Sequence, residues 1–346
     1  GVEVGVHRYQ RLRVAVVGLH GHRPTLAVRE LLWRSRELPR VLGGGFHSVA
    51  SYGPNRGKPT SRSRPVGVDP HKCHPCIRRD MRAYRVAYDG RPYSGFQRQP
   101  DVPTVEGTLL AGLARLGVCE RDAVPEGYAA AGRTDAGVSA VEQTVSFDAP
   151  DWLTPSAFNS ELPAGVRVWA SADVPDDFHA THDAVERRYT YFLYAPEAED
   201  DLAAETLAAL CGRHDYHNLT PDDDGTVREL SGRVERDGDL LVVGLRAGGF
   251  CRQLVRRVVG LLEEVLRDKS PRSKLDRVFT DDPLPGPEGV APAPAYPLVL
   301  TGVDYPGVEF RVDDGAVDSA RSVFEDLRVE RQTVARVAES VVSGLE

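Results

Sequence analysis

The amino-acid sequence changes character at Met81, the only methionine among its 346 residues. Residues 1–80 carry 15 lysines and arginines against 5 acidic residues, whereas the rest of the chain carries 28 against 46. The first segment has no continuous apolar face that could offset the conformational entropy lost on folding. Folding therefore depends on residues 81–346, and we interpret residues 1–80 as a disordered or mis-assigned N-terminal extension.

Two functional interpretations of this extension stay open. The run HKCHPC at residues 71–76 has metal-like spacing, but no second pair of ligands accompanies it. The excess of arginine would also suit a basic arm that binds RNA. The simplest hypothesis is that the natural chain starts at Met81, and the intact mass of the native protein tests it.

The composition narrows the class of protein. Hydrophobic residues make up 41% of the chain and charged residues 27%, which is typical of a soluble globular protein. No stretch approaches the roughly 18 apolar residues that a membrane span needs, so we expect no membrane association. Five cysteines without a repeated spacing favour a reducing, cytoplasmic location.

The strand and helix patterns of residues 81–346 occur in two similar series. Strands are predicted at residues 82–88, 141–147, 166–170, 188–194 and 298–304, with a hairpin at 227–236 and 240–245. Helices are predicted at residues 104–116, 202–211, 251–266 and 316–345, the last in one or two pieces. The pattern indicates an α+β fold with halves at 81–185 and 186–310 around an antiparallel sheet, followed by a helical tail at 311–346.

Residues 132–138, GRTDAGV, are the most informative segment for chemistry. Two glycines bracket a carboxylate directly before a strand, which predicts a tight loop that a ligand can approach closely. We call residues 132–138 the aspartate loop. Arg133 and Asp135 are two residues apart, so in an extended segment both side chains can point the same way. An adjacent guanidinium favours an ionised carboxylate, which keeps Asp135 available as a nucleophile. Taken alone, the pattern also fits a surface turn with a solvated ion pair.

Further motifs stand in order around this loop. YDG at 88–90, YSGFQRQP at 93–100 and TVEG at 104–107 precede it, and FHA at 178–180, RRYTY at 187–191, FCRQLVRR at 250–257 and VDYP at 303–306 follow it. This ordered set, spread over some two-thirds of the chain, resembles the TruA-type tRNA pseudouridine synthases. Together with the acidic composition, it suggests an archaeal, halophilic member of that family.

The resemblance implies a role for each matching residue. Asp135 would be the catalytic nucleophile, and Arg133 would pair with it and help to hold the target nucleotide out of its stack. Tyr189 would stack on the uracil, Arg256 would form an ion pair with Asp135, and Leu298 would form an apolar wall of the uracil pocket.

Further arginines are candidates for RNA contact because they accompany the aspartate loop: Arg187, Arg188, Arg252 and Arg257. Of these, we assign Arg188 and Arg252 to substrate binding. By itself, the spacing of Arg252 and Arg256 on a helix also fits an ordinary solvated face, and Tyr189 on its strand also fits a core position. Many bacterial members have histidine where this chain has Ser139, so no RNA contact is carried over to that residue.

The implied reaction breaks the N1–C1′ bond of a uridine in tRNA, rotates the uracil and rejoins it through C5. No atoms are gained and no redox step occurs, so the reaction requires neither metal nor cofactor. The family further implies uridines 38 to 40 of the anticodon arm, two ferredoxin-like halves forming a central antiparallel sheet flanked by helices, and a homodimer that shares the tRNA. Asp135 could attack C1′, attack C6 or remove a sugar proton.

Two alternatives from other functional classes are open. A non-catalytic RNA-binding protein could retain the same fold, although it would have no need of Asp135 with two arginines. A hydrolase could use Asp135 as a base, but the sequence offers no convincing second carboxylate or metal cluster at a useful spacing.

The acidic body is unusual for a protein that binds RNA. Clustered arginines can form a local positive channel, and an acidic surface with few lysines suits a salt-rich cytoplasm, where the Debye length falls to about 3 Å at 1 M salt. We therefore expect the protein to unfold and to lose its activity on dialysis into low salt, with unfolding measured by circular dichroism. Indifference of the fold and the activity to salt would contradict the halophilic hypothesis.

Overall fold

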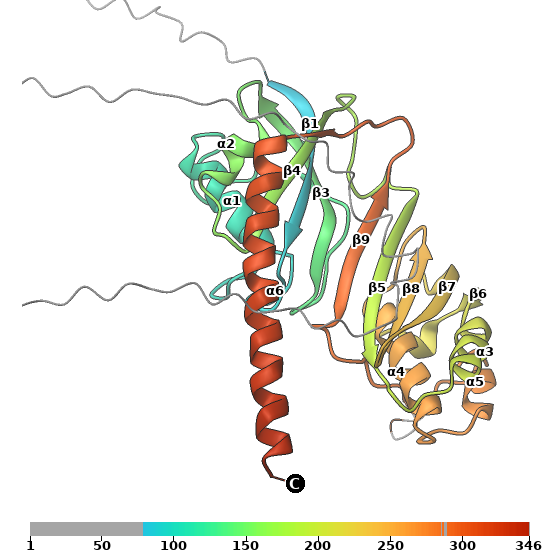
Figure 1. The fold of residues 1–346 in the computed structure, drawn as a ribbon. Helices are drawn as coiled ribbons and strands as arrows, with labels where there is room; N and C mark the ends of the chain where they lie inside the picture. The colour runs from blue at the N-terminus through green and yellow to red at the C-terminus, as the bar shows by residue number, and fades with distance from the viewer. Residues whose placement is uncertain (1–78, 285, 287–288, 346) are drawn as a thin grey trace, which may run out of the picture. The chain divides into compact units, whose positions relative to one another are not determined.

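The computed structural model describes residues 79–284, 286 and 289–345 (Figure 1). The predictions for residues 1–78, including those for HKCHPC at 71–76, lie outside the described residues. Arg79 and Asp80, the last residues of the expected extension, begin the first strand. None of the described helices combines the length and apolar character that a membrane span requires.

The described residues form one sheet of ten strands with helices packed against it (Figure 1). The strands are β1 (Arg79–Tyr88), β2 (Ala129–Ala130), β3 (Ser139–Pro150), β4 (Val166–Asp173), β5 (Glu186–Tyr194), β6 (Gly212–Asp215), β7 (Val227–Asp237), β8 (Leu240–Ala247), β9 (Leu298–Asp304) and β10 (Arg311–Val312). The helices are α1 (Val105–Arg115), α2 (Pro155–Asn159), α3 (Asp200–Leu210), α4 (Leu254–Leu266), α5 (Ser273–Arg277) and α6 (Asp314–Ser343), with a 3₁₀ turn η2 (His217–Leu219).

The strand order confirms the two ferredoxin-like halves. The sheet runs β10-β4-β1-β3-β9-β5-β8-β7-β6, and β2 also pairs with β3. Numbered along the chain within each half, with the short edge strand β6 left out, β4-β1-β3-β2 and β9-β5-β8-β7 both have the order 4-1-3-2, with helices in the βαββαβ pattern. All pairs within each half are antiparallel.

The predicted sheet was antiparallel, but the sheet in the structure is mixed. Strand β3 of the first half and β9 of the second run parallel, with Ser139 opposite Val299 and Ala140 opposite Leu300. Each half fixes the direction of its own strands relative to one another, but the direction across the junction depends on how the two halves meet. This short junction is where the two halves join in the sheet.

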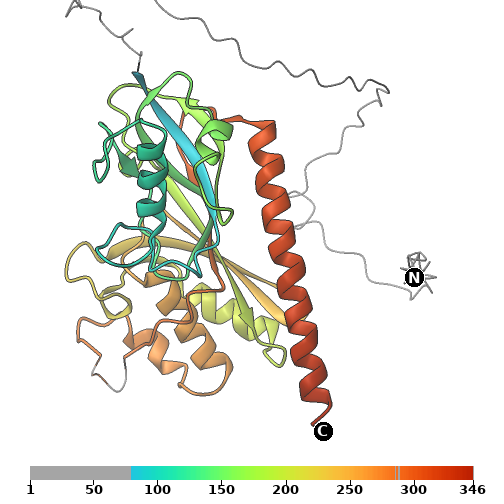
Figure 2. The same cartoon turned by 90° about the vertical axis from the view of Figure 1, so that its left-hand side faces the viewer.

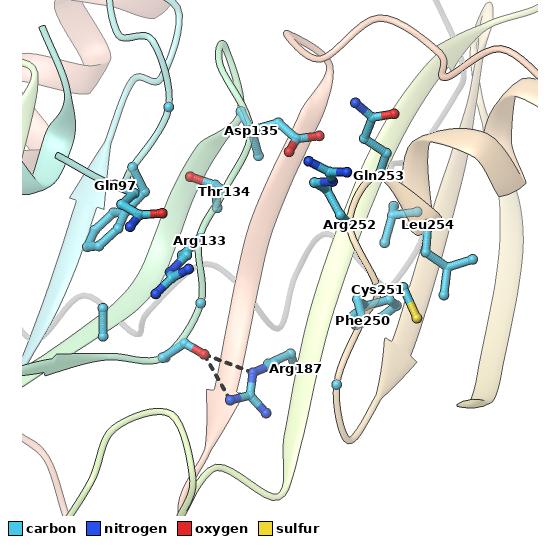
Figure 3. Close-up of a pocket in the computed structure, with 18 of the residues that line it drawn as sticks. Gln97, Arg133, Thr134, Asp135, Arg187, Phe250, Cys251, Arg252, Gln253 and Leu254 are labelled. Carbon is cyan, nitrogen blue, oxygen red and sulfur yellow. Dashed lines mark hydrogen bonds between the residues drawn. The ribbon is translucent and has the colours of Figure 1, made fainter. Parts of the chain in front are cut away.

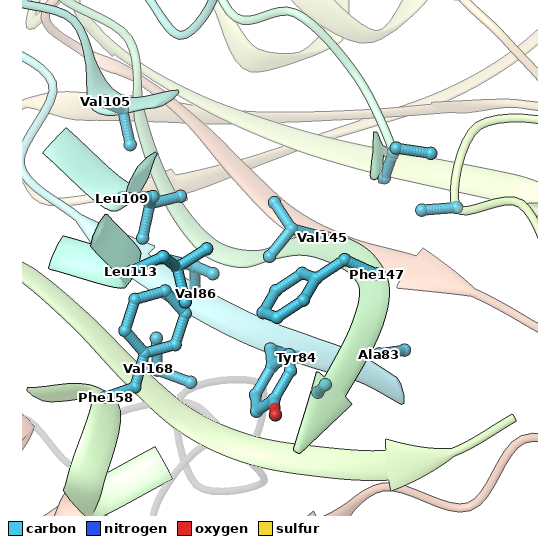
Figure 4. Close-up of a cluster of buried hydrophobic side chains, with 14 of the residues drawn as sticks. Ala83, Tyr84, Val86, Val105, Leu109, Leu113, Val145, Phe147, Phe158 and Val168 are labelled. Atoms are coloured by element: carbon cyan, nitrogen blue, oxygen red, sulfur yellow. The ribbon is translucent and has the colours of Figure 1, made fainter. Parts of the chain in front are cut away.

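Each half has its own hydrophobic core. In the first, α1 and α2 cover β1, β3 and β4, and Tyr84, Phe147 and Phe158 are buried together, with the Tyr84 and Phe147 rings stacked at 5.1 Å (Figure 4). In the second, α3 and α4 cover β5, β7 and β8. Tyr189 packs against both cores, so this residue lies where the two halves meet.

The helix ends follow local signals, some of which the sequence revealed. The Thr104 side chain accepts a hydrogen bond from the Gly107 amide at 3.2 Å and begins α1 as predicted. The predicted helix at 251–266 begins only at Leu254, because Gln253 has a left-handed φ of 60°. The predicted terminal helix is one unbroken element, α6.

Helix α6 is attached to the body by its first turns. Ala316 and Ala320 are its buried residues, and Figures 1 and 2 show the helix continuing past β4. The Asp313 carboxylate caps its N-terminus, accepting from the Ala316 amide at 2.9 Å and from the Ser156 hydroxyl at 2.7 Å. Asp313 thus joins α6 to α2.

The Asp313 cap leads to a prediction about stability. Partial burial opposes ionisation, but the hydrogen bonds from Ala316 and Ser156 outweigh it and lower the pKa of Asp313. Because the folded-state pKa is the lower one, the stabilisation is present above the unfolded-state pKa and is lost as pH falls through the folded-state value. We expect Asp313→Ala to reduce the free energy of unfolding in urea by about 1 kcal/mol at pH 7. An equal loss at a pH below the folded-state pKa would contradict a role for the charged cap.

Candidate active site

A cavity of about 1330 Å³ lies between the two halves. It is larger than the roughly 300–1,000 Å³ of typical small-molecule pockets, so it can admit part of a macromolecule. The aspartate loop, β5 and the segment leading into α4 contribute to its lining (Figure 3). Of the predicted site residues, the cavity brings together Arg133, Asp135, Tyr189, Arg252, Arg256 and Leu298.

The predicted ion pair between Asp135 and Arg256 is present. Arg256 Nη1 donates to Asp135 Oδ2 at 3.0 Å, and the two side chains are only 16% and 28% exposed, respectively. Arg256 Nε also donates to the Ala293 carbonyl oxygen at 2.7 Å, which holds the guanidinium in place. The pair joins a loop of the first half to helix α4 of the second.

Arg133 lines the cavity, but it makes no ion pair with Asp135 within the described part of the chain, contrary to prediction. The Asp135 carboxylate is instead paired with Arg256. The loop bends after Asp135, whose carbonyl accepts from the Val138 amide at 3.1 Å, and Gly137 has a φ of 85°. Figure 3 shows Arg133, which is exposed, pointing to a different part of the cavity from Asp135.

Hydrogen bonds from buried polar groups hold the aspartate loop in place. Tyr88 and Gln143 are 1% and 0% exposed. The Tyr88 and Thr134 hydroxyls are hydrogen-bonded at 2.8 Å, and the Gln143 amide donates to the Gly132 carbonyl at 2.8 Å. The Phe96 amide donates to the Thr134 carbonyl at 3.0 Å. These bonds fix the backbone on both sides of Arg133.

Ser139 has a structural contact in this chain. Its hydroxyl oxygen accepts from the Gly90 amide at 3.1 Å. A Cβ atom at Gly90 would lie 1.9 Å from the Val138 carbonyl oxygen, so only glycine allows this approach. The YDG motif at 88–90 is thereby held against the end of the aspartate loop.

Tyr189 and Leu298 give the cavity an apolar wall. The Tyr189 ring meets Phe250 edge to face, with the ring centres 5.1 Å apart. Burial raises the pKa of Tyr189 to about 12, and the nearby charge of Asp135 adds to the rise, so the phenol is neutral at ordinary pH. Leu298 is 4% exposed. An aromatic face beside an aliphatic side chain suits a flat, neutral base.

Arg188 does not lie in the cavity. Side chains of a strand alternate between its faces, and Arg188 lies on the face opposite Tyr189, where its guanidinium pairs with Glu186 and Asp304. Arg187, which shares the Tyr189 face, lines the cavity instead. The alternation of side chains along the strand RRYTY already indicated that Arg187, not Arg188, shares a face with Tyr189.

Arg252 lies at the cavity with its side chain 60% exposed. Its guanidinium forms an ion pair with Asp222 at 3.4 Å, and its backbone amide donates to the same carboxylate at 2.7 Å. Asp222 was not predicted, because nothing in the run of three aspartates at 222–224 distinguishes a cavity residue from a solvated one. The cavity thus carries both signs of charge.

Comparison with known proteins identifies the family. The tRNA pseudouridine synthase family model matches residues 207–306. The tRNA pseudouridine synthase A of Haloarcula marismortui is 59% identical over 275 residues, covering 77% of this chain and 100% of that relative. The chain belongs to the tRNA pseudouridine synthase A family. Other members are 59% identical over 260 residues in Natronomonas pharaonis, covering 75% of this chain and 97% of that relative, and 34% identical over 268 residues in Methanosarcina barkeri, covering 75% and 98%.

Membership of the tRNA pseudouridine synthase A family confirms the resemblance inferred from the ordered motifs. Members in Haloarcula, Natronomonas and Halobacterium are 55–59% identical to this chain, which agrees with the expected archaeal, halophilic type. The family is one of isomerases, so the prediction of an enzyme is also confirmed.

Proposed function

We propose that the protein isomerises uridine to pseudouridine in the anticodon stem-loop of tRNA, at one or more of positions 38 to 40. The observation that carries this proposal is the ion pair between Asp135 and Arg256, within a cavity that is also lined by Tyr189 and Leu298. Family membership supports the reaction, and the resemblance to TruA-type enzymes supports the anticodon arm.

The chemistry needs a carboxylate beside the target nucleotide. The N1–C1′ bond breaks, C1′ bonds to C5 of the same uracil, the proton on C5 is lost to solvent, and N1 gains a proton. Asp135 can assist by attacking C1′ or C6, or by removing a sugar proton, and each route uses the ionised carboxylate. The donor from Arg256 keeps that carboxylate oriented toward the cavity.

The detached base must be held while it rotates. Taking a base out of its stack costs a few kcal/mol, which contacts in the pocket must offset. The neutral Tyr189 ring and the Leu298 side chain provide a surface on which uracil can turn without forming a bond that fixes one orientation. The exposed Arg133 and Arg252 are placed to contact phosphates of the tRNA.

We extend the proposal to the organisation of the protein. Residues 81–185 and 186–310 act as two halves that close around the target nucleotide, and residues 311–346 form a tail. The resemblance to TruA-type enzymes supports a homodimer whose subunits share the tRNA, and the tRNA substrate favours a cytoplasmic location.

Tritium release tests the proposal. A tRNA transcript labelled with [5-³H]uridine at every uridine, including positions 38, 39 and 40, is incubated with the protein. A matched transcript, labelled in the same way, carries cytidine at these three positions. We expect release from the first transcript and background release from the second. Binding without release from either transcript would favour the non-catalytic alternative, and equal release from both would place the target outside positions 38 to 40.

A further inference from the structure

The guanidinium N–H groups of Arg187 all donate hydrogen bonds to backbone carbonyls. Nε donates to the Ala131 carbonyl at 3.0 Å and Nη2 donates to the same oxygen at 2.8 Å (Figure 3). Nη2 also donates to Thr181 at 2.6 Å, and Nη1 donates to Ala184 at 3.3 Å and to Gly248 at 2.5 Å. A guanidinium has five N–H groups, and all five are used here.

These partners belong to three segments that converge on the cavity. Ala131 directly precedes the aspartate loop, and Thr181 and Ala184 belong to the connection between β4 and β5. Gly248 begins the segment that carries Phe250 into α4. Arg187 lies on β5, on the same face as Tyr189. One side chain therefore connects the loop of Asp135 with the wall formed by Tyr189 and Phe250.

A role in binding RNA phosphate fits this arrangement poorly. No carboxylate pairs with Arg187 within the described residues, so its charge is compensated only by carbonyl dipoles, and burial lowers the pKa of its guanidinium. A phosphate contact would have to break one of the backbone bonds. Arg252, in contrast, is exposed at the cavity and can exchange its Asp222 partner for a phosphate.

We infer that Arg187 is a positioning residue that sets the distance between the Asp135 loop and the Tyr189–Phe250 wall. The inference rests on the proposed function, because it assigns Arg187 to that reaction. Arg187 acts through the backbone of the loop and touches neither the base nor the phosphates. Lysine cannot replace it, because three donors on a single nitrogen cannot reach four carbonyls that surround a planar fork.

The test compares Arg187→Lys and Arg187→Gln with wild type in kcat, tRNA Kd and the salt dependence of Kd. We expect kcat to fall by about 10²-fold, because a displacement near 1 Å costs about that much. Kd and its salt slope should stay at the wild-type values, whereas Arg252→Gln should reduce the salt slope by about 1. If Arg187→Lys and Arg187→Gln reduce the salt slope as Arg252→Gln does, Arg187 is a phosphate contact and the inference is overturned.

Arg236→Gln separates positioning from general stability. Arg236 also donates to backbone carbonyls, those of Ala195 and Ala198, but it does not line the active-site cavity. We expect Arg236→Gln to lower the unfolding midpoint and to leave kcat at the wild-type value below that midpoint. If the wild type is active and Arg187→Gln has the wild-type kcat, the inference about Arg187 is overturned but the proposed function is not. If the wild type releases no tritium, the proposed function is overturned.

Discussion

Replacing Asp135 with asparagine is expected to abolish pseudouridine formation while tRNA binding is retained. Asparagine has nearly the same shape as aspartate, and its amide oxygen can still accept from Arg256, so the loop should keep its geometry. It has no anionic oxygen to act as nucleophile or base, and we expect kcat to fall by more than about 10³-fold. Nucleoside analysis of digested tRNA measures the product, and filter binding measures the Kd.

A matched change elsewhere controls for the loss of a charged pair. Asp304 forms an ion pair with Arg188 on the face of the sheet opposite Tyr189. Asp304→Asn also removes a carboxylate charge from an ion pair with an arginine, but it does not alter the cavity. We therefore expect this variant to form pseudouridine as the wild type does. If both variants lose activity equally, the effect belongs to the fold rather than to the Asp135 carboxylate.

Replacing Arg256 with glutamine should produce the second-largest loss, about 10²–10³-fold in kcat. The variant leaves the half-buried Asp135 without its donor at 3.0 Å and removes the tie to the Ala293 carbonyl. Arg256→Lys should lie between wild type and glutamine, because lysine supplies charge but not the planar fork that reaches both partners. Steady-state tritium release gives kcat and KM for each variant.

The double variant tests whether the two residues act together. If Arg256 works only by holding Asp135, then the double variant Asp135→Asn/Arg256→Gln should bind tRNA with the same Kd as Asp135→Asn alone. A weaker Kd for the double variant would contradict this role and would point to a separate contact between Arg256 and the tRNA.

The fold was largely predictable because its signals are local. Alternating and helical periods, the Thr104 cap and the paired order of strands led to two similar α+β halves. The missed elements β2, β6, β10, α2 and α5 contain two to five residues, too few to show a period. The parallel junction of β3 and β9 depends on how the two halves meet, which no local pattern encodes.

The site was predictable only in part from the residues themselves. Asp135 and Arg256 are 121 residues apart, so their pairing came from the family resemblance rather than from spacing. The spacing argument for Arg133 was wrong because Asp135 pairs with Arg256 of the other half instead. The prediction that Arg188 lies at the site was wrong because strand alternation places Arg187, not Arg188, on the face of Tyr189. The period of two is therefore stronger evidence than the presence of an arginine.

Single-turnover tritium release with Asp135→Asn in excess over [5-³H]uridine tRNA measures the dependence of the chemical step on that one carboxylate. Excess enzyme saturates the tRNA, so the rate is independent of binding and product release. We predict that the wild type releases the label in a single phase and that the variant releases none above the enzyme-free blank. Release by the variant at the wild-type rate would show that another group performs the chemistry in this cavity.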